Sequence, residues 1–194
     1  TSGAFGANCA CADGTEVKSG DQKNKQLPEA IQAGPTVREV IWGVQKQSDL
    51  NKIERELSKD RKVRILRDKS LRTYDDMGLG IGFRISQRKE LDPEPLSFNM
   101  PGRITRVDKR ATFYERAEPL AMSHIVFGVP DCKSIEEVYG RIGFVATDRY
   151  YSDRGVFLRA SERANHHNLF VMNIGGRKPK FYHVAFKVRD IHEV

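Results

Sequence analysis

Three segments of the sequence open in the same way and are followed by the same order of elements. Glu39, His124 and His183 each begin a run whose fourth residue is aromatic and whose sixth is valine; the runs read EVIWGV, HIVFGV and HVAFKV. A segment with a helical pattern and an acidic residue near its start follows each run. This recurrence of letters and of element order predicts a duplicated βαβββ unit. The alternative is that short apolar strands look alike by chance.

The first copy has the pattern of a strand, a helix and three further strands. Leu50, Ile53 and Leu57 mark one face of the helix, which Ser48 and Asp49 can cap. The opening run alternates β-branched and aromatic residues, as strands do. We expect a helix over residues 50–59 and strands over residues 37–44, 62–66, 70–74 and 79–86.

The second copy repeats this order, and the third copy only begins. We expect a helix over residues 134–142 and strands over residues 124–129, 144–150, 155–160 and 167–174. Residues 181–188 then predict a strand, and residues 190–194 the start of a helix. Ahead of the first copy, Asp13-Gly14 predicts a hairpin turn, and residues 28–34, PEAIQAG, predict a short helical turn.

These elements predict an α+β fold of repeated βαβββ modules that form cupped mixed sheets in two domains. Residues 1–90 are expected to form an N-terminal domain of degenerate, partial modules. Residues 91–121 are rich in proline and mixed charge, and they predict a connector. Residues 122–194 are expected to form a C-terminal metal-binding domain. This domain is expected to be incomplete, because the module that begins at residue 181, the fourth when the partial module at the start of the chain is counted, is truncated.

Charge and cysteine usage narrow the classes of function. The formal net charge is +7 and the pI about 9.4, but lysine and arginine are interleaved with acids along the chain. We therefore do not expect a nucleic-acid partner. Three cysteines are too few for a disulfide scaffold, and Cys9-Ala-Cys11 lacks the second pair of a zinc site. Reduced thiols, and no apolar run long enough to span a membrane, predict a cytoplasmic protein.

The histidines gather toward one end of the chain, all of them between residues 124 and 192. His124 and His183 open equivalent strands, so both imidazoles are expected on the same face of the sheet and in one cup. Neutral imidazole is a common ligand of iron, manganese and zinc. The alternative for each is a partly buried ring without a ligand. Glu39 stands at the equivalent position of the first copy, so that copy is not expected to build the same site.

The remaining histidines are less constrained by the repeat. His166 and His167 are adjacent, so on a strand at most one of them can face the cup. If Phe170 and Met172 point outward, His167 shares the face of Leu169 and Val171. We expect the fifth histidine, at position 192, to be solvated.

Several motifs resemble those of the vicinal oxygen chelate superfamily, and in particular its type I extradiol ring-cleaving dioxygenases. The resemblance covers residues 122–194 well and residues 37–86 more weakly. The motifs are SHIVFGVPD at 123–131, IGFVATDRY at 142–150, GVFLRA at 155–160, NHHNLFVM at 165–172 and YHVAFKVRDI at 182–191. The HHNL element favours the dioxygenase branch.

The resemblance implies a ligand set and a catalytic residue. His124 and His183 match the two histidines that bind the metal, Fe(II) or alternatively Mn(II), and His167 matches the histidine that handles protons. The family's third ligand is a glutamate on a late strand of the fourth module, which the sequence does not reach. Glu193 falls on the first helix of that module and is not expected to replace it. We therefore expect the 194 residues to be a fragment, a cleaved product or the ordered part of a longer chain.

The expected function is extradiol cleavage of a catechol-type or polyhydroxylated aromatic substrate by O2 at a non-haem metal. The expected partners are a small aromatic diol, O2 and, since paired-module proteins of this kind associate, further copies of the chain. Other functions on the same scaffold stay open: a glyoxalase-like isomerase, or a metal-free protein that binds a ligand between aromatic side chains. Oxygen consumption and bound iron distinguish these alternatives.

Overall fold

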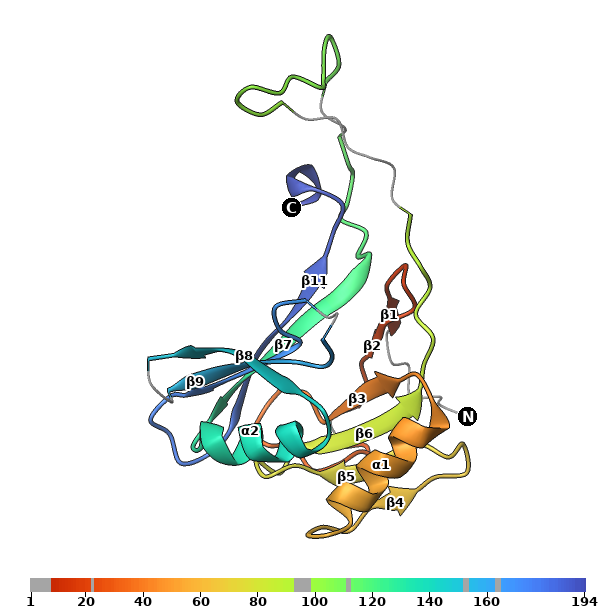
Figure 1. Ribbon diagram of the computed structural model, residues 1–194, viewed down its shortest axis with the longest axis vertical. Helices are drawn as coiled ribbons and strands as arrows, with labels where there is room; N and C mark the ends of the chain where they lie inside the picture. Colours follow the sequence, from red (N-terminus) through yellow and green to blue (C-terminus); the bar gives the residue numbers. More distant parts are fainter. Residues whose placement is uncertain (1–7, 22, 93–98, 111–112, 152–153, 163–164) are drawn as a thin grey trace.

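In the described part of the chain, two mixed sheets, a small hairpin and two α-helices make up the fold (Figure 1). The computed structural model describes residues 8–21, 23–92, 99–110, 113–151, 154–162 and 165–194. Residues 1–7 and 22 of the predicted N-terminal domain lie outside the described residues, and so do residues 93–98 and 111–112 of the predicted connector. Within the described part, no helix is both long and apolar enough to cross a bilayer.

The first complete module has the predicted order of elements. It consists of β3 (Glu39–Val44), α1 (Gln47–Leu57), β4 (Arg64–Ile65), β5 (Leu71–Tyr74) and β6 (Gly80–Ile85). The strand order is β3-β6-β5-β4, with β3 parallel to β6 and the other pairs antiparallel. Ahead of it, β1 (Asn8–Ala10) and β2 (Glu16–Lys18) form the predicted hairpin.

The second module repeats this topology strand for strand. It consists of β7 (Ala121–Val129), α2 (Cys132–Arg141), β8 (Val145–Tyr150), β9 (Gly155–Arg159) and β10 (Leu169–Asn173). Here too the first strand is parallel to the last, and the remaining pairs are antiparallel. The next copy begins with β11 (Lys180–Lys187), antiparallel to β7, and a 3-10 turn (Ile191–Glu193). The predicted α+β fold of repeated βαβββ modules is confirmed.

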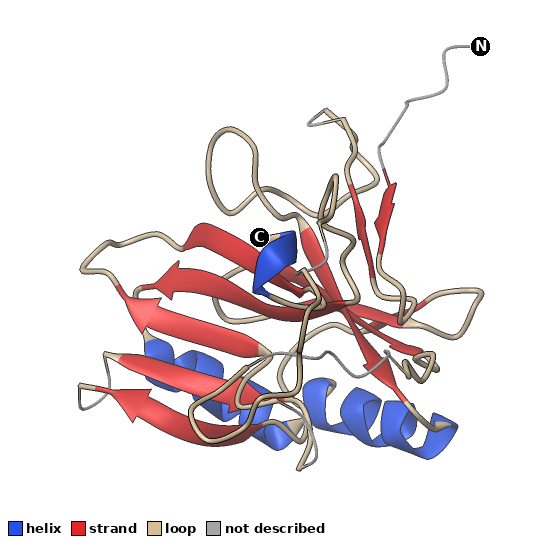
Figure 2. Ribbon diagram, turned by 90° about the horizontal axis from the view of Figure 1, so that it is seen from above, coloured by secondary structure: helices blue, strands red, loops and turns tan. Residues whose placement is uncertain are grey.

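The two helices cover the same side of the sheets, where they share one core (Figure 2). α1 buries Leu50, Ile53 and Leu57, the three residues whose spacing predicted its apolar face. α2 buries residues with the same spacing, among them Ile135 and Tyr139. Each fully buried large side chain contributes about 1.5–3 kcal/mol. The opposite faces of the sheets are therefore free to carry polar side chains.

Two local predictions are wrong. Residues 28–34 form no helix, and residues 31–34 are bends. A turn of this length, ended by Gly34-Pro35, forms too few hydrogen bonds to offset the cost of nucleation. α1 also begins earlier than predicted. Its cap residue is Lys46, which makes no side-chain cap hydrogen bond, and Ser48 and Asp49 lie in the first turn. In contrast, Asp131 caps α2 by accepting hydrogen bonds from the backbone N–H groups of Lys133 and Ser134.

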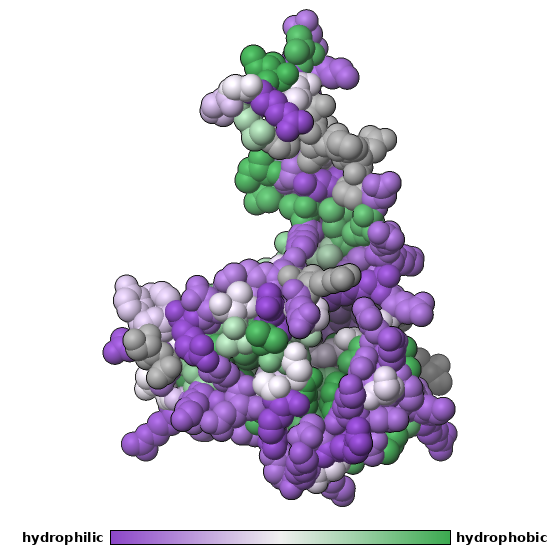
Figure 3. Space-filling model, viewed as in Figure 1, coloured by the Kyte–Doolittle hydropathy of each residue, from purple (hydrophilic) through white to green (hydrophobic). Residues whose placement is uncertain are grey.

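In the predicted connector, residues 99–110 lie away from the sheets (Figure 1). Within it, Met100 and Arg103 form an isolated antiparallel bridge. The segment is rich in exposed apolar side chains, which appear as green atoms at the top of Figure 3. Ile104, Val107 and Phe113 are 72%, 64% and 98% exposed.

Polar contacts of α2 join the two modules. The Tyr139 hydroxyl donates to Oδ2 of Asp75 at 3.1 Å, and the Arg141 guanidinium lies 2.7 Å from Oδ2 of Asp60. Asp75 lies in the turn between β5 and β6 and also accepts hydrogen bonds from the backbone N–H groups of Met77 and Leu79. Burial of this carboxyl raises its pKa to about 7, although the hydrogen bonds oppose the shift.

The raised pKa of Asp75 predicts that the protein loses stability as pH rises. A carboxyl with a higher pKa in the folded state stabilises the fold below its unfolded value, near 3.8, and this stability is lost as pH rises through about 7. Asp75→Asn removes this titration. We expect the free energy of unfolding of the wild type, relative to Asp75→Asn, to fall by about 2 kcal/mol between about pH 5.5 and about pH 8. Urea denaturation at the two pH values measures this, and an equal difference at both would contradict it.

Candidate metal centre

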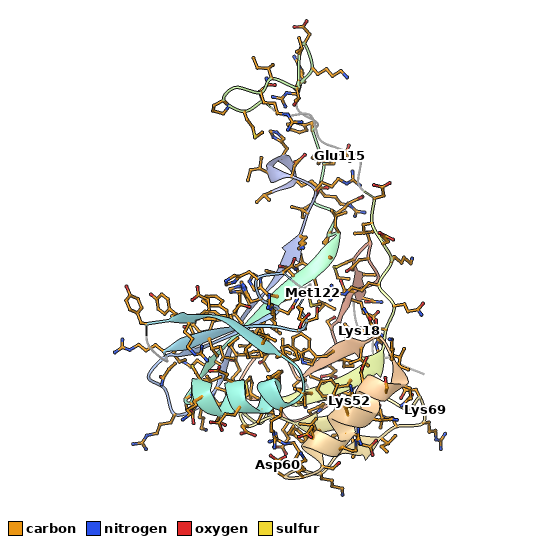
Figure 4. All side chains as sticks on the ribbon, in the orientation of Figure 1. Lys18, Lys52, Asp60, Lys69, Glu115 and Met122 are labelled. Carbon is orange, nitrogen blue, oxygen red and sulfur yellow. The ribbon has the colours of Figure 1, made fainter. Side chains whose placement is uncertain are left out.

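Two imidazoles from neighbouring strands meet on the face of the sheet that the helices do not cover. His124 lies on β7, two residues after Met122, which is labelled in Figure 4. His183 lies on β11, opposite Val126, while Ala185 is opposite His124. The two histidines are therefore diagonal neighbours on an antiparallel pair, within reach of each other's rings. Their Nε2 atoms are 3.3 Å apart.

This separation fits a shared metal ion. Two nitrogen ligands at about 2.1 Å from one ion, with an angle between about 90° and about 109°, lie roughly 3.0–3.4 Å apart. A hydrogen bond between two neutral rings also fits 3.3 Å. Among the residues that the structure describes, no group of three or more His, Cys, Asp or Glu side chains is placed to hold a metal. His124 and His183 thus fit two ligands of a site that needs at least one more.

His167 lies beside this pair, but not as the sequence predicted. β10 begins at Leu169, so His167 precedes the strand and does not follow its alternation. Its ring centroid is 4.3 Å from that of His124 and 5.0 Å from that of Phe157. The prediction that it shares the face of Leu169 and Val171 is therefore wrong, because those two residues are buried in the core on the helix side.

His166 also lies in the loop, so the expectation that only one of the adjacent histidines faces this side does not apply. Its Nδ1 is 3.1 Å from Nδ1 of His167, and its ring contacts Phe157 edge-on at 5.3 Å. Phe157 in turn stacks on Phe170, with centroids 4.0 Å apart and planes within 8°. These aromatic rings form a wall beside His124 that the sequence did not indicate.

The surroundings of the histidines favour their neutral forms. Burial lowers the pKa of His124, and the neighbouring His183 lowers it further. Burial also lowers the pKa of His167 to about 4, helped by the nearby His124, His166 and His183. A neutral imidazole has the lone pair that can bind a metal or accept a proton.

Asn168 holds the loop of His167 against both neighbouring strands, and sequence reasoning missed it. Its side-chain oxygen accepts a hydrogen bond from the backbone N–H of Ala160, and its amide donates to the carbonyl of Ser123. Its backbone N–H donates a hydrogen bond to the carbonyl of Leu158, and its backbone carbonyl accepts one from the N–H of Ile125. The sequence feature that could have indicated this role is an asparagine directly before a buried strand. The Asn168 side chain is 8% exposed.

Other candidate residues lie apart from the three rings. His192 is exposed, as predicted. Glu193 is buried, and its carboxylate accepts a hydrogen bond from the backbone N–H of Arg189. Glu39, the counterpart of His124 in the first module, forms an ion pair with Arg72 at 2.9 Å. That module therefore does not repeat the imidazole pair.

Comparisons with solved structures place this geometry in a known fold. No protein-family model matches the chain, and no curated protein matches it significantly. The structure is similar to that of BphC, a halotolerant catechol dioxygenase, with a TM-score of 0.61 and 15% identity, covering 97% of this chain and 63% of that one. The chain has the vicinal oxygen chelate fold.

Two further structures show the same fold. An extradiol ring-cleaving dioxygenase from B. fuscum matches with a TM-score of 0.58 and 18% identity, over 82% of this chain and 44% of that one. A Mn(II)-bound glyoxalase from Novosphingobium aromaticivorans matches with a TM-score of 0.54 and 17% identity, over 80% of this chain and 47% of that one. The chain thus spans less than two thirds of each of these relatives.

Asn168→Ala is expected to lower the free energy of unfolding by about 1–3 kcal/mol, because it leaves the N–H of Ala160 and the carbonyl of Ser123, both in part-buried hydrogen bonds, without this partner. Asn165→Ala is the matched control, since that side chain accepts an exposed hydrogen bond from Lys187 and makes no other among the residues that the structure describes. Its effect is expected to stay within about 0.5 kcal/mol. Urea denaturation of both variants measures this, and equal losses would contradict a special role of Asn168.

Proposed function

We propose that the protein is a metal-dependent dioxygenase that cleaves a catechol-type or polyhydroxylated aromatic ring beside its two hydroxyls. The observation that carries this is the pair of imidazoles with Nε2 atoms 3.3 Å apart, with a third imidazole 4.3 Å from one of them, centroid to centroid. Similarity to catechol and extradiol dioxygenases in fold supports it. O2 and a small aromatic diol are the proposed substrates.

In this proposal His124 and His183 bind the metal, and a glutamate from outside residues 1–194 completes the ligand set. The metal is Fe(II), or alternatively Mn(II), since the same ligands accept both. When bound, it supplies a Lewis acid that lowers the pKa of a substrate hydroxyl and passes electron density to dioxygen.

His167 is proposed as the acid–base residue. Its ring contacts His124 and Phe157, so it borders the space beside the imidazole pair. From there it accepts the proton of a substrate hydroxyl and returns it as the ring opens, so no net proton is consumed. Phe157 and Phe170, stacked on the same side, offer an apolar wall for an aromatic ring.

A glyoxalase-like isomerase is the second candidate, and the fold of the Mn(II)-bound glyoxalase favours it. Both functions place a metal on the same face of the sheet. They differ in their redox chemistry, because ring cleavage incorporates O2 whereas an isomerase consumes none. Oxygen uptake therefore separates them.

Metal binding tests the ligand assignment. His124→Ala and His183→Ala are each expected to weaken Mn(II) binding at least roughly tenfold, because each removes one of two imidazole donors. His167→Ala is expected to retain the metal, and His192→Ala, at an exposed position, is the matched control. Equilibrium dialysis of the purified variants measures this. Equal metal content in all four would rule out the assignment.

Oxygen uptake with catechols tests the reaction. The full-length protein loaded with Fe(II) is expected to consume O2 and to form a yellow ring-opened product. His167→Ala is expected to lower kcat by about 10²–10⁴-fold while the metal stays bound, since it removes acid–base catalysis. His192→Ala serves again as the control. Metal-loaded protein that isomerises a substrate without O2 uptake would favour the glyoxalase-like function instead.

A further inference from the structure

A cavity of about 300 Å³ opens on the first module, on the face of its sheet that α1 does not cover. Leu71 and Thr73 of β5 are buried toward the core, so Arg72 and Tyr74 between and after them point to the other face and line the cavity. Glu39 contributes from β3. This face corresponds to the one that carries the imidazoles in the second module.

The registers of the two sheets show what replaces the aromatic wall. In the second module Phe170 of β10 is opposite Phe157 of β9. The equivalent pair in the first module is Gly82 of β6 opposite Arg72 of β5. A Cβ atom at position 82 would lie 2.8 Å from Cδ of Arg72, so glycine there leaves room for the arginine to lie across the sheet. The guanidinium group of Arg72 thus takes the place that the stacked rings of Phe157 and Phe170 hold in the second module.

The cavity carries more positive charge than its own acid neutralises. Arg64 of β4 is directly opposite Arg72 in the antiparallel register, an arrangement of like charges that destabilises a sheet. Glu39 pairs with Arg72 at 2.9 Å. Arg64 and Lys25 line the same cavity, and neither forms a salt bridge within the described part of the chain.

The rim of the cavity is fixed in place by packing and hydrogen bonds. Arg38 donates hydrogen bonds to the carbonyls of Leu27 and Pro28, which lie on the rim together with Lys25. Pro28 packs on Gly80, where a Cβ atom would clash with the proline ring. The segment that carries Lys25 is therefore held against the sheet, beside the two arginines.

We propose that this cavity binds a small anion with a carboxylate or phosphate group. The guanidinium group of Arg64 supplies paired donors that match either group, and Arg72 adds the positive charge and the N–H groups that Glu39 and the Leu71 carbonyl do not take. The anion relieves the repulsion between the two arginines. Lys25 adds a further positive charge at the rim. The volume fits a small molecule. This site is separate from the proposed metal centre and does not depend on its function.

Calorimetric titration of the 194-residue chain with inorganic pyrophosphate and, separately, with succinate tests the proposal. We expect saturable binding of at least one of the two, and the tighter ligand identifies the phosphate or the carboxylate class. Arg64→Gln is expected to weaken that binding at least roughly tenfold. Because Arg64 is exposed on a short strand and has no salt bridge among the described residues, this variant is expected to fold.

Lys52→Gln is the matched control, since it removes one positive charge from α1 on the other side of the sheet (Figure 4). It is expected to leave the affinity within about twofold. Saturable binding that is lost in Arg64→Gln but kept in Lys52→Gln would support the site. The absence of saturable binding of both anions would overturn it. Equal weakening of binding in the two variants would also overturn it, because a general attraction to the net charge of +7 would then explain the binding.

Discussion

The antiparallel pairing of β7 with β11 is the constraint on which the proposed site depends. Each of these strands opens a βαβββ copy, and their register makes His124 and His183 diagonal neighbours on one face. The helices cover the other face, so the imidazoles stay accessible. A shift of one residue in this register would turn His183 to the opposite face and separate the pair. Backbone hydrogen bonds between two copies thus set the separation of two side chains.

One topology carries two different chemistries in this chain. The second module brings imidazole and phenyl rings to the free face of its sheet, whereas the first brings Glu39, Arg72 and Arg64. The strand order and helix placement are the same in both. Side chains on the helix side are mostly apolar in both modules and form the core, so the other face is free to differ.

The sequence predicts the features that depend on local periodicity. The repeated runs predict the element order, the spacing of Leu50, Ile53 and Leu57 predicts the buried face of α1, and alternation places His124 and His183 together. Features that depend on where a strand begins are not predictable in this way. His167 lies just outside β10, so its direction follows from the loop that Asn168 holds. The opposition of Arg64 and Arg72 likewise depends on a register that spans a turn.

The central claim is that His124 and His183 hold one metal ion between them. Anomalous X-ray diffraction from crystals of the protein grown with Mn(II) tests it most directly, because it locates the ion without reference to activity. The account predicts one peak within about 2.0–2.3 Å of Nε2 of both histidines. A peak bound by only one of them, or no peak on this face of the sheet while the Nε2 atoms stay 3.3 Å apart, would contradict it.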